Sequence, residues 1–139
     1  MGTTQHADPE SVGGSICSGT SFCGQAGDGL YSPGSQDRLP STVLRAGGAT
    51  VSVTGSNLES TKDDVVAALA AEGLHVYARH GASPEEMRRY MSIALELQPH
   101  VVIDDGGDLV ELLHESQRQH GEQMLGACEE TTSGVLRAR

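Results

Sequence analysis

The sequence lacks tryptophan, has few aromatic residues and contains no long apolar run. Aromatic residues make up 3% of its 139 residues, so any hydrophobic core must consist mainly of aliphatic side chains and methionine. No apolar stretch approaches the roughly 20 residues that span a bilayer. The polar N-terminus also has no signal-peptide pattern. We therefore expect a cytoplasmic protein that does not enter a membrane.

Basic residues and cysteines are also scarce. The net charge of −10 at pH 7 disfavours nucleic acid as a partner. The cysteines Cys17, Cys23 and Cys128 are too few for a disulfide framework, and their number is odd. No second pair of ligands accompanies Cys17 and Cys23, so we expect no metal site. Neither a GxGxxG fingerprint nor a P-loop is present, and we expect no bound cofactor.

The first part of the chain differs in composition from the rest. More than half of the 18 glycines precede residue 49, and residues 11–40 show neither the period of a strand nor that of a helix. Such a composition buries too little apolar surface to offset chain entropy. We therefore predict an irregular Gly/Ser/Pro-rich arm over residues 1–43 and one folded domain over residues 44–139. The alternative is an arm that becomes ordered on contact, as a lid or an oligomer arm.

From residue 49 onward, apolar strands alternate with amphipathic helices. Ser83 followed by Pro84 predicts a helix start, because serine caps helices and proline fits their first position. Strands that alternate with helices form a parallel sheet covered by helices on both faces. We therefore predict an α/β fold, a small three-layer Rossmann-like domain. Its expected strands are residues 49–54, 74–78, 100–104 and 123–127.

Polar residues follow the predicted strands, at the edge of the sheet where ligands bind in such folds. Asp105 and Glu130 are the strongest candidates for catalysis, because two acids at adjacent strand ends gain nothing structural from being close. Their carboxylates could accept hydrogen bonds from a ribose, or one could act as a general base for a small-molecule ligand. The candidate ligand-binding residues are Asn57, Arg79, His80, Asp108, Thr131 and Thr132.

Several of these candidates also have a structural interpretation. Asp108 could simply cap the helix that follows it, and Gly106 and Gly107 could only make the turn. The segment 131–133 could be another helix N-cap. For any one of these residues, the structural and functional interpretations are about equally favoured.

Two motifs are specific: DDGGDL at residues 104–109 and EETT at residues 129–132. With two further blocks they resemble the substrate-binding domain of the S-adenosyl-L-homocysteine hydrolase (adenosylhomocysteinase) family. The resemblance extends over residues 44–139. The four blocks are SNLESTKDDVVAAL (56–69), GLHVYARHGASPEE (73–86), VVIDDGGDLVELLHE (101–115) and EETTSGVLRAR (129–139).

The resemblance implies that Asp105 is the catalytic acid/base, that Glu130 binds the adenosine ribose, and that residues 131–133 approach NAD. The sequence also departs from the family. A strand ending in Leu-His and a Thr-bearing helix are expected before Leu44, where the Gly/Ser-rich arm stands instead. The family's Asn, catalytic Lys and Asp and its NAD-binding domain would follow Arg139. Because the family first oxidises the ribose with NAD, we expect these 139 residues alone not to hydrolyse S-adenosylhomocysteine.

The leading hypothesis is therefore an adenosylhomocysteinase-like domain that binds a small molecule. One alternative is a repurposed cofactor-free cyclase, isomerase or lyase of bacterial secondary metabolism, since preorganised acid/base groups accelerate reactions without a cofactor. Another is a non-catalytic partner of a full-length hydrolase or a methyltransferase. Loss of the family's first strand would expose a sheet edge or apolar face, so we also expect a homo-oligomer.

Overall fold

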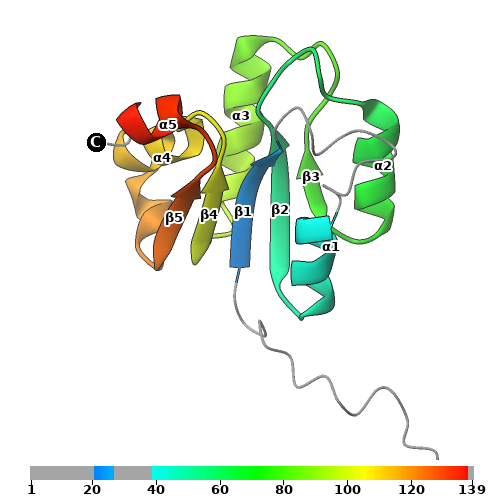
Figure 1. Ribbon diagram of the computed structural model, residues 1–139, viewed down its shortest axis with the longest axis horizontal. Coiled ribbons are helices and arrows are strands. Elements are labelled where there is room, and N and C mark those ends of the chain that lie inside the picture. The colour runs from blue at the N-terminus through cyan, green and yellow to red at the C-terminus, as the bar shows by residue number, and fades with distance from the viewer. Residues whose placement is uncertain (1–20, 27–38, 138–139) are drawn as a thin grey trace, which may run out of the picture.

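A computed structural model describes residues 21–26 and 39–137, which form a five-stranded sheet with helices on both faces. The strand order is β3-β2-β1-β4-β5, and every neighbouring pair is parallel (Figure 1). This architecture confirms the predicted α/β, Rossmann-like fold. The strands are β1 (Ser21–Ala26), β2 (Thr50–Gly55), β3 (His75–Tyr77), β4 (Val101–Asp104) and β5 (Gly126–Glu129).

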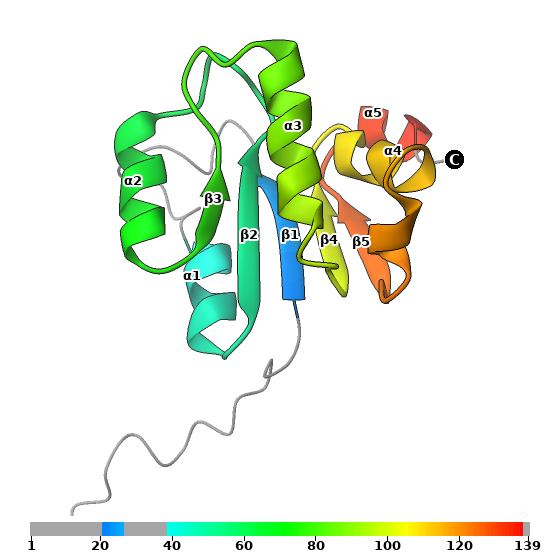
Figure 2. The ribbon, with the colours of Figure 1, turned by 180° about the vertical axis from the view of Figure 1, so that it is seen from behind.

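The helices form two layers around the sheet. Figures 1 and 2 show α1 and α2 on one face and α3 and α4 on the other. The predicted helix start at Ser83 is confirmed: its hydroxyl accepts a hydrogen bond from the N–H of Glu86, and the Glu86 carboxylate accepts one from the N–H of Ser83. The helices are α1 (Leu39–Ala46), α2 (Asp63–Ala71), α3 (Pro84–Leu95), α4 (Asp108–His114), the 3₁₀ helix η3 (Arg118–Gly121) and α5 (Thr132–Arg137).

Two hydrophobic clusters hold the layers together, one on each face of the sheet. The cluster under α1 and α2 contains only residues from these helices, from β2 and β3, and from their flanks. The cluster under α3 and α4 adds side chains from β1 and β4. Its fully buried members are Cys23, Ala94, Leu95, Val102, Leu109 and Leu112.

β1 is the central strand, although the sequence analysis placed it in an irregular arm. It pairs with β2 along its whole length and with β4 over Phe22–Gly24, and the Cys23 side chain is fully buried. The prediction was wrong for this segment because SFCGQA has no hydrophobic alternation, whereas strand formation depends strongly on the neighbouring strands. The predicted boundary after residue 43 also falls inside α1. The other residues of the arm, 1–20 and 27–38, lie outside the described residues.

The position of β1 also removes one argument about assembly. We expected self-association because a missing strand would leave the sheet with an open edge. The sheet instead has β1 between β2 and β4, so its centre is complete. Any argument for self-association must rest on other features.

The last strand is displaced from its expected position. It begins at Gly126 rather than at residue 123, because a turn follows η3, with the N–H of Met124 bonded to the carbonyl of Gly121. Met124 packs against the cluster under α3 and α4 instead of joining the strand. Across the described ranges, no helix is both long enough and apolar enough to cross a membrane.

Candidate functional site

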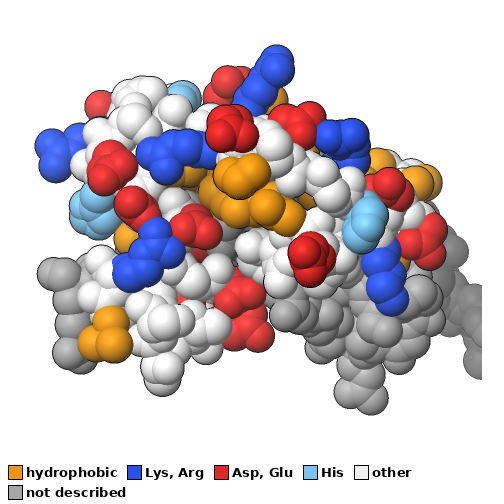
Figure 3. Space-filling view, turned by 90° about the horizontal axis from the view of Figure 1, so that it is seen from above, with side chains coloured by type: hydrophobic (Ala, Val, Ile, Leu, Met, Phe, Trp, Pro, Cys, Tyr) orange, Lys and Arg blue, Asp and Glu red, His pale blue; other side chains and the backbone are white. Residues whose placement is uncertain are grey.

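The carboxyl ends of the five strands lie at one edge of the sheet, which we call the rim. Figure 3 looks onto this face and shows acidic and basic side chains around an apolar patch. β1 separates the candidates into two groups, because it lies between β2 and β4. Asn57, Arg79 and His80 follow β2 and β3, whereas Asp105, Asp108, Glu130, Thr131 and Thr132 follow β4 and β5.

Asp104 ends β4 with its side chain fully buried. Its carboxylate accepts hydrogen bonds from three backbone N–H groups, those of Asp105, Leu109 and Val110, at 3.1, 3.3 and 2.9 Å. Two of these donors belong to the first turn of α4, where N–H groups have no partner within the helix. Asp104 therefore joins the end of β4 to the start of α4.

Glu129 ends β5 and is the direct neighbour of Asp104 in the register of the two strands. One of its carboxylate oxygens accepts hydrogen bonds from the N–H of Gly106 at 2.9 Å and from both the N–H and the hydroxyl of Thr131 at 2.7 Å. The carboxylate also lies against the Cα of Gly134, where a larger residue would collide with it. Glu129 therefore fixes the β4–α4 turn and the start of α5 relative to each other.

The two carboxylates differ in their electrostatic state. Burial raises the pKa of Asp104, and the charge of Glu129 adds to that effect, although the N–H donors of α4 oppose it. Burial also acts against the charge of Glu129, but the N–H groups of Gly106 and Thr131 outweigh it and lower its pKa. The environment of the pair therefore raises the pKa of Asp104 and lowers that of Glu129.

Asp105 and Glu130 each come one residue after these anchored acids. The N–H of Glu130 donates to the carbonyl of Asp104 at 3.0 Å, so the pairing of β4 and β5 continues one step beyond the strands. This contact brings the backbones of the two predicted catalytic residues side by side at the rim. The Asp105 side chain is half-buried and that of Glu130 is exposed.

Asp108 and Thr131 also have hydrogen-bond partners within the fold. Asp108 accepts a hydrogen bond from Arg137 at 2.8 Å, and Arg137 also donates to the carbonyl of Gly106 at 2.7 Å and pairs with Glu111. The Thr131 hydroxyl accepts from the N–H of Gly134 at 3.2 Å, which matches the structural N-cap interpretation. Thr132, the first residue of α5, is exposed.

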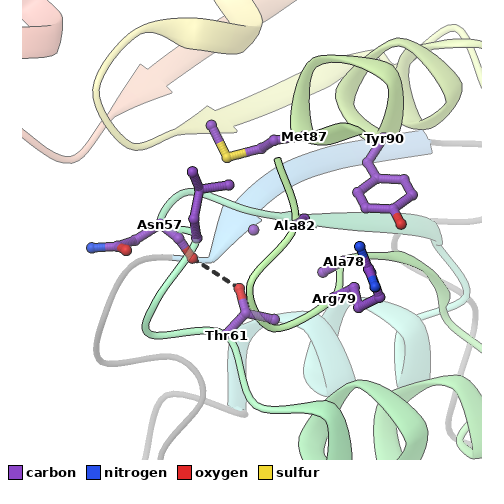
Figure 4. Close-up of a pocket in the computed structure, with 9 residues that line it drawn as sticks. Asn57, Thr61, Ala78, Arg79, Ala82, Met87 and Tyr90 are labelled. Atoms are coloured by element: carbon purple, nitrogen blue, oxygen red, sulfur yellow. Dashed lines mark hydrogen bonds between the residues drawn. The ribbon is translucent and has the colours of Figure 1, made fainter. Parts of the chain in front are cut away.

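The β2–β3 side of the rim is built differently, from a loop that closes on itself. The side-chain oxygen of Asn57 accepts from the N–H of Glu59 at 2.9 Å, and its carbonyl accepts from the hydroxyl of Thr61 at 2.9 Å (Figure 4). The His80 ring donates from Nδ1 to the carbonyl of Thr61 at 2.9 Å, and the N–H of His80 donates to Asp63. Asn57 and His80 therefore order the loop.

Arg79 is paired on the surface with Glu86, with both carboxylate oxygens 2.9 Å from one guanidinium nitrogen. The charge of Glu86 raises the pKa of Arg79. The pocket beside it, below Met87 and Tyr90 of α3 (Figure 4), has a volume of about 10 Å³. That volume holds about one water molecule. A wider hollow of about 360 Å³ lies at the opposite, amino end of β2 and β3 and includes none of the candidate residues.

Asp104 and Glu129 are the residues that the sequence analysis missed. Each of them directly precedes a candidate acid. The alternation of buried residues along β4 could have distinguished Asp104 from Asp105, because Val102 and Asp104 lie on the same, buried side of the strand. The second acid of each pair then falls after the strand. Within the described part of the chain, no three His, Cys, Asp or Glu side chains are grouped so that they could hold a metal ion.

Comparison with known proteins identifies the family of the chain. The family model described as S-adenosyl-L-homocysteine hydrolase matches residues 39–135. Over 97 residues, or 70% of the chain, the sequence is 52% identical to an adenosylhomocysteinase of Pyrococcus abyssi and 49% identical to one of Aeropyrum pernix. Over the same length it is 45% identical to an S-inosyl-L-homocysteine hydrolase of Methanocaldococcus jannaschii. The match spans 23% of the length of each of these relatives. The chain therefore belongs to the S-adenosyl-L-homocysteine hydrolase family.

Proposed function

We propose that this domain binds a purine nucleoside, or a nucleoside joined to homocysteine, at the rim beyond β4 and β5. The relatives are named for S-adenosyl- and S-inosyl-homocysteine, and these two compounds share a purine nucleoside and a homocysteine. Asp105 and Glu130 accept hydrogen bonds from the ribose hydroxyls. A site built to bond hydroxyl groups discriminates strongly against ligands that lack them, because its acceptors would remain unpaired.

One observation carries the proposal: the acid that precedes each candidate is anchored by backbone N–H groups of the fold. Asp104 and Glu129 bind backbone N–H groups and fix two neighbouring strand ends. The next acids, Asp105 and Glu130, lie beyond this anchored pair at the rim, where Asp105 is half-buried and Glu130 is exposed. Two acids whose backbones lie side by side after neighbouring strand ends suit a diol ligand, since positioning is lost when supporting residues are loose.

We further propose that these 139 residues alone do not hydrolyse S-adenosylhomocysteine. The family's chemistry uses NAD, and the sequence contains no GxGxxG fingerprint. The threonines that the resemblance assigns to NAD do not fit that role well, because Thr131 bonds Glu129 and Gly134. Only Thr132 and its neighbour Ser133 remain exposed there. Release of homocysteine from pure protein supplied with NAD would contradict this part of the proposal.

Calorimetric titration tests the binding site directly. The full chain is titrated with adenosine, with inosine and, as a separate control, with 2′,3′-dideoxyadenosine, which lacks the hydroxyls. We expect binding of at least one nucleoside, no detectable binding of the dideoxy compound, and loss of at least about tenfold in affinity in Glu130→Gln and in Asp105→Asn. Glu122→Gln is the matched control, because Glu122 is an exposed acid that precedes the amino end of β5, whereas the rim lies at its carboxyl end.

The outcome also separates this proposal from the alternatives. Equal binding of adenosine and its dideoxy analogue would contradict recognition of the ribose. Absence of nucleoside binding by a well-folded sample would contradict the proposal and favour a cofactor-free enzyme or a docking module. No contact among the described residues favours either alternative at present over nucleoside binding.

A further inference from the structure

The two candidate acids are joined through the residues that follow them in the chain. One carboxylate oxygen of Glu129 accepts hydrogen bonds from the N–H of Gly106 at 2.9 Å and from the N–H of Thr131 at 2.7 Å. Gly106 directly follows Asp105, and Thr131 directly follows Glu130. A single oxygen atom therefore holds the residue after each candidate acid, and it sets the distance between the two turns.

A second contact joins the same two turns on the other side of Asp105. The N–H of Glu130 donates to the carbonyl of Asp104 at 3.0 Å, and Asp104 directly precedes Asp105. Asp104 and Glu129 are themselves neighbours in the register of β4 and β5. Asp105 and Glu130 therefore belong to one closed ring of hydrogen bonds, with one bond before Asp105 and one after it.

The Glu129 carboxylate is itself fixed by contacts with α5. It lies where the side chain of a larger residue at position 134 would begin, so it packs against Gly134. The hydroxyl of Thr131 donates to the same carboxylate oxygen at 2.7 Å and accepts from the N–H of Gly134 at 3.2 Å. Arg137 donates to the carbonyl of Gly106 at 2.7 Å. The carboxylate cannot shift without breaking contacts to both turns.

The bonds of Glu129 differ in direction from those of the other anchored acid. Asp104 binds the N–H groups of Leu109 and Val110, so it attaches the start of α4 to its own strand. Glu129 connects the turn after β4 with the turn after β5. Groups that bind a ligand together must be held within about 0.5 Å of their productive geometry. The contact that fixes the two turns relative to each other therefore bears directly on a ligand held by both.

We propose that Glu129 is the positioning residue for ribose recognition: it sets the separation of Asp105 and Glu130, and thereby the preference for a ligand with two neighbouring hydroxyls. This inference rests on the proposed function, because it concerns the same site. The length of the Glu129 side chain matters more than its charge, since the carboxylate must reach both turns.

Affinities of the full chain for adenosine and 2′-deoxyadenosine, measured by calorimetry, test this role. We expect the wild type to prefer adenosine at least about tenfold, and Glu129→Asp, which keeps the charge but is one methylene shorter, to reduce this preference to about twofold or less. Glu129→Gln keeps the length and an acceptor oxygen, so it should retain more of the preference than Glu129→Asp. An unchanged preference in Glu129→Asp, or the reverse order of the two variants, would overturn the role.

Glu86→Asp is the matched control. The Glu86 carboxylate also accepts a backbone N–H, that of Ser83, but at the start of α3 on the other half of the sheet. We expect Glu86→Asp to lower Tm and to leave the preference for adenosine unchanged, which separates a loss of stability from a loss of position. A parallel loss of preference in Glu86→Asp would show that destabilisation alone has this effect, and would reject the role of Glu129.

Amide hydrogen exchange of the ligand-free chain supplies a readout that does not depend on binding. In Glu129→Asp we expect the N–H groups of Gly106 and Thr131 to exchange at least about tenfold faster, because local opening becomes easier. The N–H groups of Leu109 and Val110, which Asp104 holds, should exchange as in the wild type. Unchanged exchange at Gly106 and Thr131 would reject the inference whatever the ligand. Absence of nucleoside binding by the wild type would instead contradict the proposed function, and this role with it.

Discussion

The polar residues at the strand ends have different hydrogen-bond partners in the two halves of the sheet, on either side of β1. On the β2–β3 half, helices cover both faces, and the strand-end residues are bonded mostly within their own loops or to exposed partners, as in the Arg79–Glu86 pair. On the β4–β5 half, the buried carboxylate of Asp104 and the half-buried carboxylate of Glu129 bond the backbone of the turns that follow. The difference shows that the turns after β4 and β5 are bound to the strand ends by more hydrogen bonds to the backbone.

The energetic reason is burial. An exposed ion pair such as Arg79–Glu86 is screened by water and restrains the backbone weakly. A buried carboxylate that accepts several N–H bonds cannot move without leaving donors unpaired. The β4–β5 half is therefore the rigid part of the rim, and it carries the two acids that the sequence singled out.

The largest effect is expected from removal of the buried anchor on that half. Asp104→Ala leaves the N–H groups of Asp105, Leu109 and Val110 without their acceptor. Unpaired buried donors cost about 1–3 kcal/mol each, so we expect a loss of roughly 3 kcal/mol or more in the free energy of unfolding. Urea denaturation followed by circular dichroism measures it.

Asp105→Asn is the matched control, because Asp105 is the neighbouring carboxylate but is only half-buried. We expect its unfolding free energy to change by less than about 1 kcal/mol. Similar losses of unfolding free energy in Asp104→Ala and Asp105→Asn would show that Asp105 stabilises the fold as much as Asp104 does. That result would contradict a structural role for Asp104 alone.

The second prediction concerns the contact between Glu129 and Gly134. In Gly134→Ala the new methyl group collides with the Glu129 carboxylate, so either the carboxylate or α5 must move. We expect a destabilisation of about 1–3 kcal/mol, the usual cost of overpacking, and weaker nucleoside binding. Gly126→Ala is the control, because the space around Gly126 is open. If thermal unfolding of the two variants coincides, Glu129 does not fix α5.

The elements that followed simple rules could be predicted from the sequence. The strands at 49–54 and 100–104 were found because β-branched and apolar residues run through them, and α3 because Ser83 caps it. β1 was missed, since SFCGQA has no pattern of its own and is a strand only between β2 and β4. Long-range pairing of this kind is not encoded in any short window.

The candidate site was predicted only in part, for a related reason. The order of the strand ends follows from the α/β pattern, and it correctly grouped the acids of β4 and β5 at one edge. The sequence does not reveal which acid of the pairs Asp104–Asp105 and Glu129–Glu130 is anchored in the fold. That depends on the strand register, in which Asp104 and Glu129 are direct neighbours. The surface pairing of Arg79 with Glu86 and the cap at Thr131 are side-chain contacts that a motif does not reveal.

A third, smaller effect concerns the response of stability to pH. The pKa of Glu129 is lowered from 4.5, so the unfolded chain binds more protons just below pH 4.5 and stability falls as the pH falls through the folded value. The pKa of Asp104 is raised from 3.8, so the folded chain binds more protons above pH 3.8 and stability falls as the pH rises through that window. The two groups have opposite slopes.

Glu129→Gln separates these slopes. We expect this variant to be less stable than the wild type at pH 6 and above, and the difference to shrink as the pH is lowered below 4.5. The falling slope above pH 3.8 that belongs to Asp104 should become weaker, because the Glu129 charge no longer contributes to it. Thermal melts at closely spaced pH values measure both. A constant difference between the two proteins across this range would contradict the lowered pKa of Glu129.

The smallest effects are expected from two exposed arginines, one on each half of the sheet. Arg79→Met removes a surface pair with Glu86, and we expect no resolvable change in Tm or in nucleoside binding. Arg137→Met removes bonds to the carbonyl of Gly106 and to Asp108, which hold the turn after β4 against α5. Although both arginines are about half exposed, we expect Arg137→Met to lower Tm measurably and to weaken nucleoside binding. Equal behaviour of the two variants would mean that the turn is already fixed by Asp104 and Glu129 alone, and the rigidity of this half would then lie entirely in its buried carboxylates.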